Sequence, residues 1–225
     1  RLRLVGKLIP SVCRMARWGV LGNNQTAVVE SSSASGLALL DMEDRDPTKT
    51  SSRGTGKLIL AALEEGFRDI LVGLGDSATN DGGIGIAQEL GVRILDEAGY
   101  EVQDGGGYLK DICNLDISGI HGSVREAQFT ILCDVNNLLC GPNGASAVFG
   151  PQKGASPDQV LSLDYGLKHL SNLIETKIGI NVSSVDGSGA GGGSGAGLMA
   201  FCGANLRPGF EVLSDILNLA ELLID

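Results

Sequence analysis

Glycine is the feature that most constrains how this chain can fold. The sequence contains 34 glycines in 225 residues, about twice the usual share of roughly 7%. They follow no collagen period and gather in two clusters, GLGDSATNDGGIG at 73–85 and DGSGAGGGSGAG at 186–197. The second cluster could be a flexible linker, but it runs directly into the apolar segment GLMAF, which is typical of a helix. Because a glycine turn before a helix can present backbone amides to an anion, we favour contact with a ligand or with other backbone over a linker.

Between these clusters the hydrophobic pattern alternates between helices and strands. The runs at 69–74 and 129–134 are continuously apolar, which is typical of strands covered on both faces. The sequence Ser156-Pro157-Asp158 predicts a well-capped helix start. This alternation predicts an α/β fold. The predicted helices cover 33–40, 55–65, 83–90, 156–174 and part of 208–223, and the predicted strands or extended segments cover 2–9, 12–21, 26–30, 69–74, 92–95 and 129–134.

Composition excludes several classes of protein. Acidic residues outnumber basic ones, 27 to 17, which gives a net charge of −10 and argues against nucleic-acid and polybasic membrane partners. No apolar run reaches the roughly 18 residues of a membrane span. The five cysteines are odd in number and contain no CxxC pair, so we expect free thiols in the cytoplasm, without a disulfide framework or zinc site. The start at Arg1 in mid-pattern and the apolar end at Ile224 lead us to expect a processed or incomplete chain.

Three familiar motifs match too poorly to assign a function. Residues 192–196 resemble a nucleophile elbow, but neither of the two histidines has a matching context. The stretch 187–192 satisfies G-x-G-x-x-G almost automatically in so glycine-rich a run and follows no clear strand. The stretch 51–58 resembles a Walker loop but lacks its first glycine, and Leu58 stands where the magnesium-binding hydroxyl belongs. A P-loop kinase is therefore not expected.

Three other segments carry more polar chemistry than a core requires. GDSATNDGG (75–83) and CDVNN (133–137) each follow a predicted buried strand, where α/β sheets place ligands. FGPQKGAS (149–156) isolates Lys153 among glycines. A carboxylate at Asp134 suits a metal or a substrate hydroxyl, and Lys153 suits phosphate or carboxylate, together with the loop amides at 82–83. The alternatives are plain turns, with Asp81 capping the next helix, and a solvated lysine.

These segments carry a family resemblance. AVVESSSASGLAL (27–39), VGLGDSATNDGG (72–83), FGPQKGA (149–155) and GAGGGSGAGLMAF (189–201) occur in an order that resembles the bacterial-type glycerate kinases over essentially the whole chain. The resemblance implies phosphorylation of D-glycerate to 2-phosphoglycerate with ATP and Mg²⁺. It also implies a flavodoxin-like domain with an inserted mixed α/β domain described as restriction-endonuclease-like, and an active site between the two.

For this chain the resemblance implies that residues 1–225 are mainly the inserted domain, with a mixed sheet and flanking helices. A cytoplasmic protein that acts on a small molecule is expected, and homo-oligomers are possible. The family's D-S-F-K-G and G-E-G-R-I-D motifs are absent, so we expect the chain alone to be inactive. The alternative function is a non-catalytic anion-binding module derived from such a kinase, and a dinucleotide-binding oxidoreductase ranks third.

The predicted site residues follow from these segments. Asp134 and Lys153 are the predicted catalytic residues, and Asp134 is also the predicted metal ligand. Two departures from the family pattern weaken the site: Asp76 replaces a usual glycine, and Asn136 replaces an acid. The predicted substrate- and nucleotide-binding residues are small or polar residues of the glycine-rich segments, namely Gly54, Thr55, Gly56, Ser77, Thr79, Asn80, Asp81, Gly82, Gly83, Asn137, Gln152, Gly191 and Gly192.

Overall fold

A mixed six-stranded sheet forms the centre of the protein. The computed structural model describes residues 3–9 and 14–219. The strand order is β1-β2-β3-β4-β7-β8; β1, β2 and β3 pair antiparallel, whereas β3, β4, β7 and β8 pair parallel. The predicted α/β class with a mixed sheet is therefore confirmed. The six strands are β1 (Arg3–Ile9), β2 (Arg14–Val20), β3 (Thr26–Glu30), β4 (Asp69–Gly73), β7 (Gln128–Leu132) and β8 (Asn205–Arg207), and β5 (Arg93–Leu95) pairs with β6 (Asn114–Asp116) in a separate ribbon.

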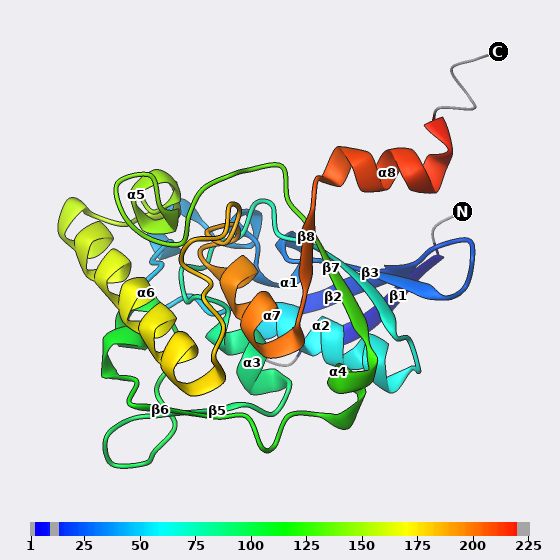
Figure 1. Ribbon diagram of the computed structural model, residues 1–225. Coiled ribbons are helices and arrows are strands. Elements are labelled where there is room, and N and C mark those ends of the chain that lie inside the picture. Colours follow the sequence, from blue (N-terminus) through cyan, green and yellow to red (C-terminus); the bar gives the residue numbers. More distant parts are fainter. Residues whose placement is uncertain (1–2, 10–13, 220–225) are drawn as a thin grey trace.

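Helices lie in layers against this sheet (Figure 1). The helix α2 contacts β1, β2 and β3, α7 contacts β7, α3 packs on both α2 and α7, and α6 lies farther out. Within residues 3–9 and 14–219, no helix is both long and apolar enough to cross a membrane. The helices are α1 (Ser32–Ser35), α2 (Arg53–Glu64), α3 (Ile84–Glu89), α4 (Gly122–Glu126), α5 (Ala145–Phe149), α6 (Pro157–Ile178), α7 (Ser194–Cys202) and α8 (Gly209–Leu217), with 3-10 turns η1 (Leu37–Leu39), η2 (Met42–Asp44), η3 (Gly106–Asp111) and η4 (Pro151–Lys153).

Two hydrophobic clusters hold the layers together. The first lies between the sheet and α2, where Leu58 and Ile59 pack with Ile70 and Phe129. The second includes Leu167 of α6 and joins α3, α6, α7 and the β5–β6 ribbon. Burial of apolar surface is the main favourable contribution to folding, so these two clusters fix the positions of the helices relative to the sheet and to one another.

Most of the predicted elements exist, although several boundaries differ. The predicted strand at 26–30 is β3, the helix at 55–65 begins two residues earlier as α2, and the α6 start has a complete capping box between Ser156 and Gln159. The strand predicted at 129–134 ends at Leu132, and only one of its faces is fully buried. The prediction of a strand covered on both faces is thus wrong for β7 and holds for β4. Residues 2, 12–13 and 220–223 of the predicted segments lie outside the described residues.

The helix predicted at 33–40 is wrong in its central part. The helix α1 ends at Ser35, and Gly36 is extended and bridges Ser77. The amide of Ala78 donates to Ser35 O (2.8 Å), and the amide of Leu37 donates to Asp76 O (2.8 Å). Pairing with the loop after β4 therefore replaces the hydrogen bonds that would have continued the helix.

The second glycine cluster is folded, and the linker interpretation is wrong. Seven consecutive residues from Gly192 to Leu198 are buried, and α7 begins at Ser194. A Cβ atom on Gly192 would lie 1.9 Å from Thr79 O, so only glycine lets the two backbones meet. The amide of Gly82 donates to Gly192 O (3.0 Å) across the same contact. The two glycine clusters therefore pack against each other through their backbones.

Candidate active site

The carboxyl ends of β4 and β7 open into one cavity of about 320 Å³. These two strands are adjacent and parallel, so the loops that follow them start at the same edge of the sheet. This is the edge at which open α/β sheets bind ligands. A larger but shallower cavity of about 510 Å³ lies at the opposite, amino-terminal ends of the strands. The cavity at the carboxyl ends is lined by Leu74, Gly75, Asp76, Ser77, Leu132, Cys133, Asp134, Val135, Phe149, Gln152, Lys153, Ala190 and Gly191.

Lys153 places a buried cation in the wall of this cavity. Its side chain comes from η4 and is only 3% exposed. Its ammonium donates to Thr79 O (2.7 Å) and to Ser77 Oγ (3.1 Å). Burial lowers the pKa of Lys153 to about 8, while the charge of Asp81 acts in the opposite direction. Because an ammonium has three N–H donors, one donor has no protein acceptor among the described residues, and the solvated-lysine alternative is excluded.

Asp76 stands where the family usually has a glycine, and its backbone conformation accounts for that preference. Its φ is +53°, in the left-handed region that glycine enters freely and that aspartate tolerates better than most residues. Its side chain is exposed and lines the cavity, and its carbonyl accepts the amide of Leu37. The backbone of this loop therefore requires glycine-like geometry, and Asp76 adds a negative charge at the cavity wall.

Asp134 follows β7 and has a structural contact in addition to its place in the cavity wall. Its Oδ1 accepts the amides of Gly209 (2.8 Å) and Phe210 (3.4 Å), so the side chain caps the start of α8. A Cβ atom on Gly209 would lie 2.8 Å from Asp134 Oδ2, which favours glycine there. The Oδ2 atom has no hydrogen-bond donor within the described part of the chain. In residues 3–9 and 14–219, no group of three or more His, Cys, Asp or Glu side chains could hold a metal ion.

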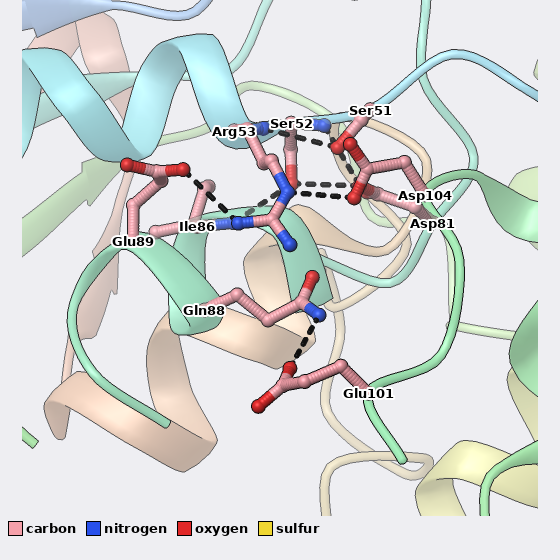
Figure 2. A network of polar contacts seen from close by, with 9 residues as sticks. All are labelled: Ser51, Ser52, Arg53, Asp81, Ile86, Gln88, Glu89, Glu101 and Asp104. Atoms are coloured by element: carbon pink, nitrogen blue, oxygen red, sulfur yellow. Dashed lines mark hydrogen bonds and ion pairs between the residues drawn. The ribbon is translucent and has the colours of Figure 1, made fainter. Parts of the chain in front are cut away.

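Asp81 connects two helix starts (Figure 2). It is completely buried, and its carboxylate accepts the amide (2.7 Å) and hydroxyl (2.8 Å) of Ser52 and the amide of Gly83 (3.1 Å). Burial raises the pKa of this carboxyl group, while these hydrogen bonds lower it. The proposed helix-capping alternative for Asp81 is therefore consistent with the structure, and the amides of Gly82 and Gly83 already have protein acceptors.

The predicted site residues separate into two groups. Ser77, Gln152, Gly191, Asp134 and Lys153 line the cavity. The remaining predicted residues have contacts within the fold, and their ligand roles stay predictions. These residues are Thr79, Asn80, Asp81, Gly82, Gly83 and Gly192, which are buried outside the cavity wall, Asn137, whose Nδ2 donates to Asn143 O (2.8 Å), and Gly54, Thr55 and Gly56 in α2.

The α2 residues lie in a helix contact. The amide and hydroxyl of Thr55 are both within hydrogen-bonding distance of Ser35 Oγ (3.2 and 3.0 Å). Cβ atoms on Gly54 and Gly56 would lie 2.3 Å from Ala34 O and 2.9 Å from Ile86 Cα. These glycines therefore let α2 approach α1 and α3 closely.

Sequence reasoning missed some residues of the cavity wall. Leu74, Phe149 and Ala190 supply apolar surface, and Cys133 lies half-buried beside Val135 O. Burial raises the pKa of the Cys133 thiol. Cys133, Phe149 and Ala190 lie within segments already selected for their polar or glycine-rich sequence, and Leu74 directly precedes one, so their place in the sequence was the signal that could have identified them.

Comparison with known proteins gives consistent results. The family model described as "Glycerate kinase family" matches residues 3–225. The chain is 48% identical to "Glycerate 2-kinase" of Escherichia coli K12 and 41% identical to "Glycerate kinase" of Bacillus subtilis 168, each over 210 residues that cover 93% of this chain and 55% of the relative. A crystal structure of a protein assigned as glycerate kinase 2 of Salmonella typhimurium LT2 matches with a TM-score of 0.92 and 43% identity, covering 100% of this chain and 60% of that one. The chain thus spans about half the length of these curated relatives.

Proposed function

Because the chain belongs to the glycerate kinase family, we propose that it provides the acceptor-binding part of an enzyme that phosphorylates D-glycerate with ATP. The relatives named glycerate kinase and glycerate 2-kinase support this reaction, and the second name supports 2-phosphoglycerate as the product. The observation that carries the proposal is the buried ammonium of Lys153 in a cavity at the carboxyl ends of two parallel strands.

Lys153 is the proposed anion-binding group of the site. A lysine ammonium acts as a compact point charge towards carboxylate or phosphate. With two of its donors held by Ser77 and Thr79, its position is fixed before a ligand arrives. A preorganised donor in a partly water-excluded site stabilises a negative charge more than a mobile surface lysine does. Ser77 and Gln152 line the same cavity and are the proposed partners of the glycerate hydroxyl groups.

Asp134 is the proposed contact for Mg²⁺ or for the proton of the acceptor hydroxyl. Its Oδ2 atom has no protein donor in the described part of the chain, so one carboxylate oxygen remains available for either role. Magnesium is commonly held by one or two carboxylates together with substrate phosphates, and this donor set fits that mode. When bound, the ion would neutralise the charge of the transferring phosphoryl group.

The remaining proposals concern the whole protein. We infer that residues 1–225 correspond mainly to the domain inserted into the flavodoxin-like domain of the family, since the match covers 55% of the curated relatives. Its likeness to restriction endonucleases is part of the same proposal. A cytoplasmic location is inferred from the composition and the bacterial relatives.

Calorimetric titration of the chain with D-glycerate and with magnesium–ATP, alongside a coupled ADP-release assay, tests the proposal. We expect D-glycerate to bind and Lys153→Met to weaken its binding tenfold or more, the effect of losing about 1.4 kcal/mol. Glycerate binding that is unchanged in Lys153→Met would contradict the proposed site. Binding of anions in general, with no preference for D-glycerate, would favour the alternative of a non-catalytic anion-binding module.

A further inference from the structure

The position of the Lys153 ammonium depends on a single loop. Both of its protein acceptors, Ser77 Oγ and Thr79 O, belong to the segment between β4 and α3. Any shift of residues 77–79 would therefore move the ammonium or break its hydrogen bonds. Whatever fixes this loop also fixes the cation in the cavity.

One end of the loop is held mainly through backbone groups. The amide of Ala78 donates to Ser35 O, and Ala78 O accepts the hydroxyl of Thr50 (2.7 Å). The other end is held through the Asp81 carboxylate, which accepts hydrogen bonds from the amide and the hydroxyl of Ser52. The hydroxyl of Ser52 also accepts the amide of Ile86 (3.1 Å), so Ser52 contacts α3 as well as the loop. We call this pair of residues the Ser52–Asp81 bridge.

The carboxylate of the Ser52–Asp81 bridge lies where helix-start amides and hydrogen bonds offset the cost of burying its charge. Figure 2 shows Ser52, Asp81 and Ile86 converging where the start of α2 meets α3. Helix starts favour negative charge, since their amides point outward, and hydrogen bonds to a carboxylate are stronger than those between neutral groups. Beside the bridge, Arg53 pairs with Glu89 of α3 (3.0 Å) and with Asp104 (2.6 Å), which ties α2 to its neighbours.

We propose that Ser52 and Asp81 are positioning residues for the anion site: their buried hydrogen bonds hold residues 77–79 where these receive the Lys153 ammonium. This inference rests on the proposed function, in which Lys153 binds the acceptor. Ser52 and Asp81 are 1% and 0% exposed and do not line the cavity, so this inference gives them a positioning role in place of the ligand contact predicted for Asp81. Asp81 also acts on Lys153 through its charge, which favours the protonated ammonium.

Two variants perturb the bridge in different ways. Ser52→Ala removes the hydroxyl and keeps the backbone hydrogen bond to Asp81. Asp81→Asn keeps the size of the side chain and removes the charge, and it also replaces one accepting oxygen with an NH₂ donor, so the hydrogen bonds from Ser52 or the one from Gly83 are lost. Ser171→Ala is the matched control, because Ser171 is also buried and its hydroxyl donates only to Lys168 O within α6.

The first measurement needs no ligand. Titration of the ¹³Cε signal of Lys153, assigned by its loss in Lys153→Met, reports the state of the ammonium. The charged or titratable groups near it are Asp81, whose charge acts on Lys153, and Asp76, Cys133 and Asp134, which line the cavity. We expect a midpoint near 8 in the parent chain and in Ser171→Ala. In Asp81→Asn the midpoint should fall by about 0.5 pH unit or more, because a nearby negative charge is lost.

The second measurement is the affinity for D-glycerate at neutral pH. We expect Ser52→Ala to weaken binding about fivefold or more, since small displacements of a positioned group are costly, and Ser171→Ala to stay within about twofold. An unshifted Lys153 midpoint in folded Asp81→Asn, together with unchanged affinity in Ser52→Ala, would overturn the inference. If Asp81→Asn does not fold, the inference is tested with Ser52→Ala alone, by its Lys153 signal and by its affinity for D-glycerate. If the parent chain does not bind D-glycerate, the proposed function is wrong. The Ser52–Asp81 bridge is then tested only by the Lys153 signals of the two variants.

Discussion

At the scale of single residues, Lys153 links the stability of the fold to pH. Its pKa is lowered from 10.5 to about 8 by burial, so the unfolded chain binds this proton more tightly than the folded one. Between these two pH values unfolding takes up a proton, and the free energy of unfolding therefore rises with pH. The full rise from this group is about 3 kcal/mol. Urea unfolding at several pH values should show it in the parent chain and not in Lys153→Met; equal pH dependence in the two proteins would refute the assignment.

Asp134 is the second residue whose role can be separated from its structural contact. Asp134→Asn keeps an acceptor for the amide of Gly209 and should preserve the fold. In a full-length enzyme that carries this region, the same change should lower turnover about a hundredfold or more, the usual scale for acid–base or metal roles. Asp134→Ala should in addition cost about 1 kcal/mol through loss of the α8 cap. Turnover of Asp134→Asn within about twofold of the parent would show that Asp134 only caps α8.

At the scale of elements, the contact between the two glycine clusters is a specific requirement of this fold. Gly192→Ala should destabilise the protein by about 3 kcal/mol or more, because its Cβ would collide with Thr79 O. Gly99→Ala is the matched control, since Gly99 also has a positive φ but has nothing within 4 Å of an added Cβ; it should cost only about 1 kcal/mol. Thermal unfolding measures both, and similar losses would show that backbone strain, and not the contact, determines the cost.

At the scale of the whole molecule, we expect the 225-residue chain alone not to phosphorylate glycerate. Phosphoryl transfer requires nucleotide, metal and acceptor to be held in line, and the chain spans only about half of its curated relatives. The helix α8 projects from the body (Figure 1) and exposes Phe210 (72%), Leu213 (50%) and Leu217 (54%). Such a surface favours self-association, which light scattering would detect. Turnover near 1 per second, in the lower range of enzymes, would show that the site is complete in this chain.

The sequence alone determined the elements whose signals are local. The Ser156 capping box, the apolar run of β4 and the periodicity of α2 depend on neighbouring residues, and each predicted element exists. The motifs also identified the family and five residues of the cavity wall, including Lys153 and Asp134. Ser77 and Asp134 follow strand ends, and the carboxyl ends of parallel strands meet at one edge of a sheet whatever the intervening sequence is.

Only the tertiary structure decided contacts between distant segments. Gly36 leaves the predicted helix because residues 76–78 pair with it, and β8 is too short and polar to be recognised before β7 pairs with it. In the sequence, the glycines at 54 and 56 resemble parts of a phosphate loop. In the structure, they let α2 approach α1 and α3 closely. Lys153 could be either a solvated loop lysine or a buried cation until Ser77 and Thr79 were seen to hold it. Burial and hydrogen-bond partners depend on what the rest of the chain brings to a residue, and local sequence carries no record of that.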